Sequence, residues 1–164
     1  MTTRVLVADA QKCTGCKLCQ IACSLQHCDV SNPARARIRI IEWNKAGVFL
    51  PVSCQQCEDA PCMAVCPREA IYRDEAFLRV AVDYDRCISC RLCVSACPFG
   101  AMGFDQEKQK VFKCDLCDGQ PQCVRFCYPK SLNFVDARMI QYPRGRKSAL
   151  QLTAIGSRPA GEKL

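Results

Sequence analysis

One stretch of the chain, residues 87–98, reads Cys87-Ile88-Ser89-Cys90-Arg91-Leu92-Cys93-Val94-Ser95-Ala96-Cys97-Pro98. Two residues separate each of its first three cysteines, and the fourth follows after three more residues and precedes a proline. The chain has 17 cysteines among 164 residues, and sixteen of them fall into four groups of this kind. Cys28 is the one left over, so the cysteines dominate the assignment of fold and function.

The four groups share this spacing with small variations. Four residues separate the second and third cysteines of the second group, and five separate them in the fourth group. Pro67 and Pro98 directly follow the second and third groups, whereas Ser24 follows the first and Tyr128 intervenes before Pro129 after the fourth. In chain order the groups are Cys13, Cys16, Cys19 and Cys23; Cys54, Cys57, Cys62 and Cys66; Cys87, Cys90, Cys93 and Cys97; and Cys114, Cys117, Cys123 and Cys127.

Three uses of so many cysteines compete: disulfide bonds, zinc sites and iron–sulfur clusters. Disulfides need an oxidising compartment, and Met1–Gln11 lacks the long apolar stretch of a secretory signal. No run approaches the ~20 apolar residues of a membrane span, so we expect a cytoplasmic protein without a direct membrane span. Structural zinc sites usually take ligands from two separated Cys-x2-Cys pairs, which leaves a zinc-binding structural module as a remote alternative.

The repeated spacing matches the Cys-x2-Cys-x2-Cys-x3-Cys-Pro run that binds [4Fe–4S] clusters in bacterial ferredoxins. Three thiolates on one tight loop can reach three irons of the same cluster. The chain then enters a short helix that carries the fourth cysteine away, so that this cysteine binds the neighbouring cluster. Such motifs act in pairs, and four of them predict two modules and four [4Fe–4S] clusters.

The second and third groups are closest in sequence, and we expect them to pair, with the first and fourth paired around them. The fourth cysteine of each group then binds the partner group's cluster. The predicted ligand sets are Cys13, Cys16, Cys19 and Cys127 for cluster one; Cys114, Cys117, Cys123 and Cys23 for cluster two; Cys54, Cys57, Cys62 and Cys97 for cluster three; and Cys87, Cys90, Cys93 and Cys66 for cluster four.

The sequence therefore predicts an α+β fold of two nested bacterial-ferredoxin-like modules, with short strands and helices around four [4Fe–4S] clusters. The outer module is expected to cover residues 1–45 plus 106–141, and the inserted module residues 46–105. Residues 142–164 form a C-terminal basic tail without cluster ligands.

Short helices and hairpins are expected between the cysteines. Arg35, Arg37 and Arg39 alternate with apolar residues before Trp43, which predicts a half-exposed strand with a solvated arginine face. The predicted helices cover Leu18–Leu25, Met63–Val65 and Leu92–Ala96, and the predicted hairpins join Ala70–Asp74 to Phe77–Asp83 and Ala101–Asp105 to Lys110–Lys113.

The low apolar content of the chain agrees with a core formed partly by metal clusters. The apolar share of 49% includes cysteine and falls to about 38% without it, which is thin for a chain of this length. We expect the clusters to replace part of the core and the cluster-free chain to be largely unfolded. The formal charge of +7 treats cysteines as neutral; sixteen thiolates (−16) and four oxidised cores (about +8) change it to about −1. A nucleic-acid partner is therefore not expected.

On these motifs the chain resembles the four-cluster ferredoxin-type subunits that serve molybdenum and tungsten bis-pterin oxidoreductases, hydrogenases and carbon monoxide dehydrogenases. The resemblance covers about residues 3–142 and implies the same nested pairing of motifs. Cys23–His27 and Asn32–Arg39, together with the short gap between Cys117 and Cys123, are similar to the soluble subunits that accompany tungsten aldehyde oxidoreductases.

The sequence contains no radical-SAM loop, GxGxxG fingerprint or P-loop, and we expect no catalytic residue and no activity of the chain alone. The prediction is an electron-transfer subunit that passes single electrons between a catalytic subunit, such as a tungsten aldehyde oxidoreductase, and a flavin/NAD subunit or soluble ferredoxin. Formate dehydrogenase, hydrogenase or CO dehydrogenase are alternative partners. A third hypothesis for the function is an enzyme that carries out catalysis at a cluster of its own. Contacts between copies of the chain are compatible with a row of clusters. We expect His27 to be structural and Cys28 to be a free thiol.

Overall fold

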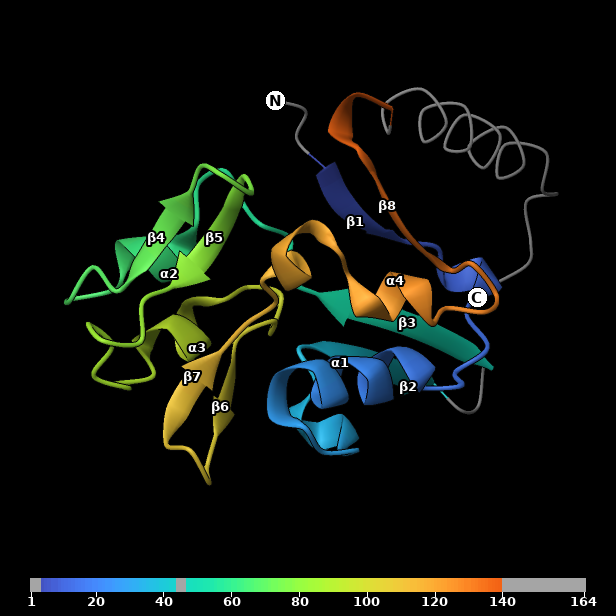
Figure 1. The fold of residues 1–164 in the computed structure, drawn as a ribbon, viewed down its shortest axis with the longest axis horizontal. Helices are drawn as coiled ribbons and strands as arrows, with labels where there is room; N and C mark the ends of the chain where they lie inside the picture. The colour runs from blue at the N-terminus through green and yellow to red at the C-terminus, as the bar shows by residue number, and fades with distance from the viewer. Residues whose placement is uncertain (1–3, 44–46, 140–164) are drawn as a thin grey trace, which may run out of the picture.

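The computed structural model describes residues 4–43 and 47–139. Within these ranges the chain forms short helices and four separate two-stranded antiparallel sheets (Figure 1). The predicted basic tail, residues 142–164, lies outside the described residues. No helix in the part of the chain that the structure describes is long and apolar enough to cross a membrane.

Segments from both ends of the chain form one half of the structure (Figure 1). Its elements are β1 (Arg4–Ala8), η1 (Ala10–Lys12), α1 (Leu18–Cys28), η2 (Pro33–Arg35), β2 (Ile38–Trp43), β3 (Val48–Ser53), η4 (Leu116–Gly119), α4 (Gln122–Arg125), β8 (Leu132–Asp136) and η5 (Ala137–Met139). β1 pairs with β8 so that Ala8 lies opposite Leu132, β2 pairs with β3, and α1 packs against α4. The first and fourth cysteine groups are thereby brought together.

The middle of the chain forms the other half. Its elements are α2 (Pro61–Ala64), β4 (Ile71–Asp74), β5 (Arg79–Val82), α3 (Leu92–Ala96), β6 (Gly103–Asp105) and β7 (Lys110–Phe112). β4 pairs with β5, β6 pairs with β7, and α2 packs against α3 (Figure 1). This packing brings the second and third cysteine groups together.

Two hairpins cross the boundaries that the sequence predicts between modules. The boundary between residues 45 and 46 separates β2 from β3, and the boundary between residues 105 and 106 separates β6 from β7. Val111 of β7 is buried in the same core as Ile71 of β4 and Val80 of β5. Hairpin pairing thus joins segments that spacing alone assigns to different modules.

Most local predictions hold within one to three residues. α3 covers Leu92–Ala96 as predicted, and both predicted hairpins form. α1 continues to Cys28 and ends at Asp29, which adopts a left-handed conformation with φ 55°. α2 begins at Pro61, because proline is well suited to the first turn of a helix.

The prediction of a strand with a solvated arginine face is wrong for two of its three arginines. Arg35 belongs to η2, and β2 begins only at Ile38. The side chains of Arg35 and Arg37 are only 14% and 15% exposed, because each turns inward to a carboxylate. Only Arg39 of the three is exposed.

The core combines cysteines with few aliphatic side chains. One buried cluster contains Ile38 and Leu132 with four cysteines, and the other contains Val80 and Val111 with Cys62 and Cys93. Cysteine thus occupies positions that leucine or isoleucine would fill in an ordinary domain. A core of this kind leaves little hydrophobic surface to offset the loss of chain entropy on folding.

We therefore predict that the protein unfolds when its metal is removed anaerobically by a chelator. Circular dichroism should show loss of most helix and strand signal, because the aliphatic core alone is too small to hold the sheets together. Mock treatment without chelator should leave the spectrum unchanged. A native spectrum in iron-free protein would contradict this view of the core.

Candidate metal centres

All four cysteine groups turn the chain in the same way. The second residue after the first cysteine has a left-handed conformation in each group: φ is 70° at Gly15, 52° at Gln56, 56° at Ser89 and 58° at Leu116. This conformation costs about 1–2 kcal/mol for residues other than glycine. Its repetition shows that four unrelated local sequences are forced into one loop shape, which curls the cysteines around a common centre.

Close packing is a second constraint that favours glycine at position 15. The ring of Phe49 in β3 covers the first cysteine loop so closely that a Cβ at Gly15 would lie 2.6 Å from ring atoms. Phe49 thereby shields the loop from water on the side of the β2–β3 hairpin. A larger residue at position 15 would have to displace this aromatic cover.

Three of the predicted ligand sets each line one cavity. The three cavities have similar empty volumes of about 330, 290 and 350 Å³. Each contains the four sulfurs of one predicted set and mainly apolar neighbours. In the same order as the volumes, the sets are Cys66, Cys87, Cys90 and Cys93; Cys13, Cys16, Cys19 and Cys127; and Cys54, Cys57, Cys62 and Cys97.

The remaining set lies where α1 meets the loop that precedes α4. Burial raises the pKa of Cys123, and four neighbouring thiols raise it further. Three of these thiols belong to the other members of the predicted set, Cys114, Cys23 and Cys117. Burial also raises the pKa of the Cys114 thiol to about 12. The four sulfurs therefore share one buried environment in which negative charge is costly without a metal.

Cysteines of different predicted sets lie close enough to interact electrostatically. The charge of Cys19 acts on Cys123, that of Cys54 on Cys114, and that of Cys62 on Cys93. These pairs link the predicted sets in the order one, two, three, four. Of the sixteen cysteines, only Cys16 of set one and Cys90 of set four are exposed.

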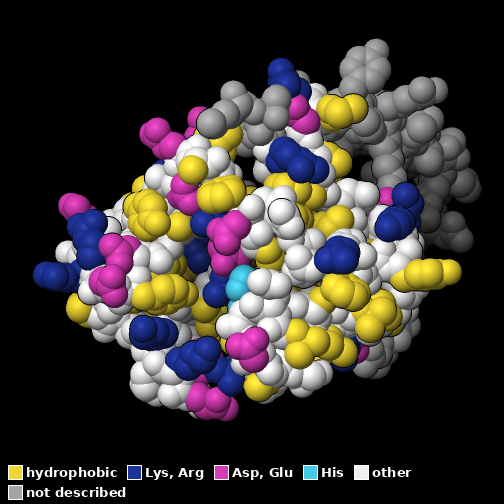
Figure 2. All heavy atoms as spheres, viewed as in Figure 1, with side chains coloured by type: hydrophobic (Ala, Val, Ile, Leu, Met, Phe, Trp, Pro, Cys, Tyr) yellow, Lys and Arg dark blue, Asp and Glu magenta, His cyan; other side chains and the backbone are white. Residues whose placement is uncertain are grey.

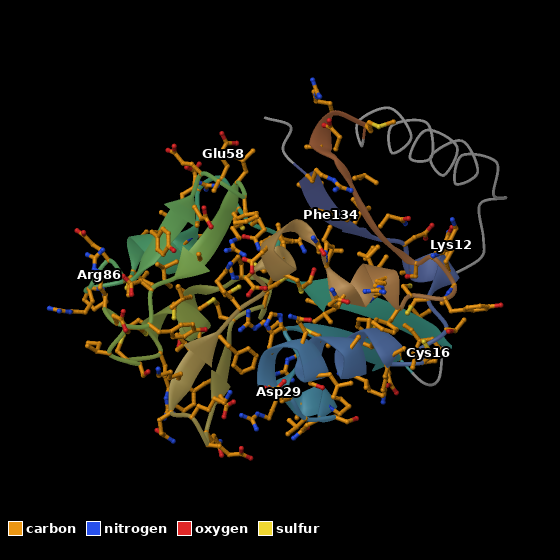
Figure 3. The ribbon with its side chains drawn as sticks, in the orientation of Figure 1. Lys12, Cys16, Asp29, Glu58, Arg86 and Phe134 are labelled. Carbon is orange, nitrogen blue, oxygen red and sulfur yellow. The ribbon has the colours of Figure 1, made fainter. Side chains whose placement is uncertain are left out.

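The two ends of this order lie at the two ends of the molecule. Figure 3 places Cys16 at one end of the long axis and Arg86, which precedes Cys87, at the other. The two terminal sets therefore reach the surface in places where different partners could approach.

Backbone amides donate hydrogen bonds to the fourth cysteine of every group. Ala70 donates to Cys66 Sγ at 3.2 Å, and Ala101 donates to Cys97 Sγ at 3.4 Å. The corresponding bonds in the other half are Leu132 N to Cys127 Sγ at 3.4 Å and Arg37 N to Cys23 Sγ at 3.2 Å. Hydrogen bonds of this kind stabilise thiolate charge and tune a bound cluster.

His27 lies at the second set, which the sequence did not predict. Its Nε2 is 3.6 Å from Cys117 Sγ and 3.5 Å from Asp115 Oδ1. The pKa of His27 is lowered, chiefly by burial and then by the charge of Arg37. Arg37 binds the other oxygen of Asp115 at 2.5 Å. His27 is thus held half-buried, and it lines a separate cavity together with Cys28, the spare thiol.

Two further polar residues near the cysteines could not be recognised from spacing. Lys113 is 3% exposed and lines the cavity of the third set. Gln56 donates through Nε2 to Cys114 O at 2.9 Å and accepts from Val80 N at 2.8 Å. These bonds connect the loops of the second and third sets across the two halves.

The donor sets fit [4Fe–4S] clusters. Three of them each surround one cavity with four sulfurs, and the backbone N–H bonds to the fourth cysteine of every group are of the kind that such clusters require. Structural zinc would use four thiolates as well, but it usually takes two from each of two Cys-x2-Cys pairs, whereas each of these three cavities has three cysteines from one loop and one from another. Over the visible face, acidic and basic side chains lie beside one another (Figure 2).

Comparisons with known proteins agree with iron–sulfur binding by this chain. A family model described as a 4Fe-4S dicluster domain matches residues 45–137, and a 4Fe-4S binding domain matches residues 10–26. YsaA of Escherichia coli K12, to which electron transport is ascribed, is 40% identical over 159 residues, covering 88% of this chain and 97% of that protein. The polyferredoxin-like subunit of an aliphatic sulfonate oxidoreductase from Pyrococcus furiosus is 42% identical over 117 residues, 71% of this chain and 67% of that protein.

Two further comparisons concern another relative and the fold. The electron transport protein HydN of Escherichia coli K12 is 35% identical over 161 residues, covering 84% of this chain and 91% of that protein. A chain of the BamBC active site complex of benzoyl coenzyme A reductase has the same fold, with a TM-score of 0.52 and 22% identity, over 96% of this chain and 92% of that chain. The chain therefore belongs to the family of ferredoxin-type [4Fe–4S] electron-transfer subunits, the non-catalytic components of oxidoreductase complexes.

Proposed function

We propose that the chain holds four [4Fe–4S] clusters and passes single electrons along them between two redox partners. The observation that carries this proposal is the trio of cavities of similar volume, each lined by four cysteines from two different motifs. The proposed ligands are Cys13, Cys16, Cys19 and Cys127 for cluster one; Cys114, Cys117, Cys123 and Cys23 for cluster two; Cys54, Cys57, Cys62 and Cys97 for cluster three; and Cys87, Cys90, Cys93 and Cys66 for cluster four.

The side chains around each centre favour electron transfer over substrate chemistry. A cluster, when bound, takes up and releases one electron without a change in its ligands. Four thiolates per centre leave no position for a substrate, and apolar residues such as Phe49 and Ile71 keep water away. Backbone amides stabilise the thiolates, so that the change in charge is spread over several hydrogen bonds.

The order of the sets supports a linear path. Neighbouring thiols connect set one to two, two to three, and three to four, and only the terminal sets have an exposed cysteine. We propose that electrons enter and leave at the loops that carry Cys16 and Cys90. The interior sets then serve as relays between two surface ports.

Two nested modules are part of the proposal. The outer module consists of the half that contains the β1–β8 pair, and the inserted module of the half that contains α2 and α3. The pairing of β2 with β3 and of β6 with β7 supports module limits after Ser53 and after Phe112, later than spacing alone suggests.

For the catalytic partner we propose a molybdenum or tungsten bis-pterin subunit of the aldehyde oxidoreductase type, with a flavin/NAD subunit or soluble ferredoxin at the other port. Support comes from the resemblance of Cys23–His27 and Asn32–Arg39, and from relatives named as subunits of oxidoreductases. The alternatives are a formate dehydrogenase, hydrogenase or CO dehydrogenase partner. Contacts between copies of the chain stay a prediction.

We also propose a cytoplasmic location, because sixteen metal-binding thiolates require reducing conditions.

Paired substitutions test the proposed ligand sets. Cys97 and Cys57 come from different motifs but share cluster three, whereas Cys97 and Cys90 share a motif but serve different clusters. We predict three intact [4Fe–4S] clusters in Cys97→Ala, still three in Cys97→Ala/Cys57→Ala, and two in Cys97→Ala/Cys90→Ala. Mössbauer spectroscopy of anaerobically purified protein counts the intact clusters.

Cys28→Ala is the matched control, because Cys28 is the one cysteine outside the sets, and it should retain four clusters and about sixteen irons per chain. The crossed assignment fails if the doublet within one motif, Cys97→Ala/Cys90→Ala, keeps three clusters. Colourless protein that contains zinc instead of iron would remove the electron-transfer proposal altogether.

The nature of the catalytic partner is open to a direct test. The tagged full-length chain, purified anaerobically from its own cells, should bring down a large subunit together with tungsten or molybdenum. Elemental analysis of the complex measures both metals. Co-purification of a nickel-containing partner free of tungsten and molybdenum would favour the hydrogenase or CO dehydrogenase alternatives.

A further inference from the structure

Lys113 is a buried cation without a carboxylate partner in the part of the chain that the structure describes. Its side chain is 3% exposed, and it follows β7 directly before the first cysteine of the fourth motif. Its Nζ donates hydrogen bonds only to neutral oxygens: the carbonyl of Val80, the carbonyl of Cys114 at 3.0 Å, and Gln56 Oε1 at 3.4 Å.

These three acceptors match the three N–H groups of an ammonium ion. Gln56 is fixed by its own bonds to Val80 N at 2.8 Å and Cys114 O at 2.9 Å, so its Oε1 points at Lys113. The site is therefore built for a charged lysine and holds it in one position.

Other cations of low exposure in the described residues are neutralised by acids. Arg35 pairs with Asp105 at 2.7 Å, and Arg79 pairs with Asp74 at 3.1 Å. Arg37 binds a carboxylate in the same way. Lys113 has no such partner, although burying a lone charge is strongly unfavourable. A fold that keeps this charge must provide a negative group that side chains alone do not supply.

The cavity of the third cysteine set lies next to Lys113. Lys113 and Val80 line it together with Cys54, Cys57, Cys62 and Cys97. Four thiolates around an oxidised [4Fe–4S] core carry a net charge of about −2, and reduction adds one more negative charge.

We propose that Lys113 is the internal counter-charge of cluster three and raises its reduction potential. The inference rests on the proposed function, since it requires a cluster in that cavity. A fixed positive charge favours the more negative, reduced form over the oxidised form. Cluster three is therefore easier to reduce than its thiolates and burial alone would make it.

The position of Lys113 gives this effect a role in the electron path. Its bond to Cys114 O ties the loop of cluster two to the wall of cluster three, where the proposed outer module meets the inserted one. An electron that crosses between the modules thus arrives at a centre stabilised by a buried cation. This favours storage of an electron in the middle of the row rather than at an exposed port.

Substitution of Lys113 tests the inference in the fully loaded protein. In Lys113→Met the side chain keeps its length and burial but loses its charge. An anaerobic redox titration followed by EPR should show one of four midpoint potentials shifted to more negative values. We expect at least a tenfold change in the reduction equilibrium constant, or about 59 mV for one electron. Lys108→Met, which removes an exposed lysine at the β6–β7 turn, is the matched control and should leave all four potentials unchanged.

Gln56→Glu provides an independent second variant. It places a carboxylate beside Lys113 Nζ without changing the size of the side chain, so it should shift the same potential in the same direction. This variant also decides the matter if Lys113→Met fails to retain its clusters. Four unchanged potentials in a loaded Gln56→Glu protein, or a positive shift in either variant, would overturn the role of Lys113. A wild-type protein that holds fewer than four clusters would instead contradict the proposed function, and the two failures are therefore distinguishable.

Discussion

The convergence of cysteine sulfurs on shared centres is the constraint on which this structure depends. Three cavities each take three cysteines from one loop and a fourth from another part of the chain, as Cys127 joins the loop of Cys13. The strained left-handed residues, the β1–β8 pair that closes the chain and the packing of α1 on α4 all serve this convergence. Because burial raises the pKa of thiols such as Cys19, to about 12, thiolate charge is costly at these centres unless a metal compensates it.

Charged side chains surround the cysteine-lined centres. The formal charge of +7 reflects arginines and lysines of which several are turned inward rather than exposed. Arg35 and Arg37 satisfy carboxylates, and Arg37 also presents its amide to Cys23. Lys113 alone among these cations faces a sulfur-lined cavity without an acid. Most interior cations are thus neutralised by acids, and Lys113 is the exception.

Cysteine spacing predicted which loops meet and which cysteines line three of the cavities, because the geometry of a tight loop depends mainly on local sequence. It also located α3 and two hairpins, where alternation and proline mark the limits. It missed the β1–β8 pair, since a contact between residues 130 positions apart leaves no local signal. It misjudged Arg35 and Arg37, because their carboxylate partners, Asp105 and Asp115, lie about 70 and 78 positions away. The burial of Lys113 and the place of His27 follow from packing, which spacing does not encode.

The most direct test of this account is anomalous diffraction at the iron absorption edge from crystals grown without oxygen. We predict four clusters of four irons each in one row, each cluster surrounded by one of the four proposed cysteine sets, with the first and last nearest to Cys16 and Cys90. Fewer than four iron clusters, or a fourth cysteine that binds the cluster of its own motif, would contradict this prediction.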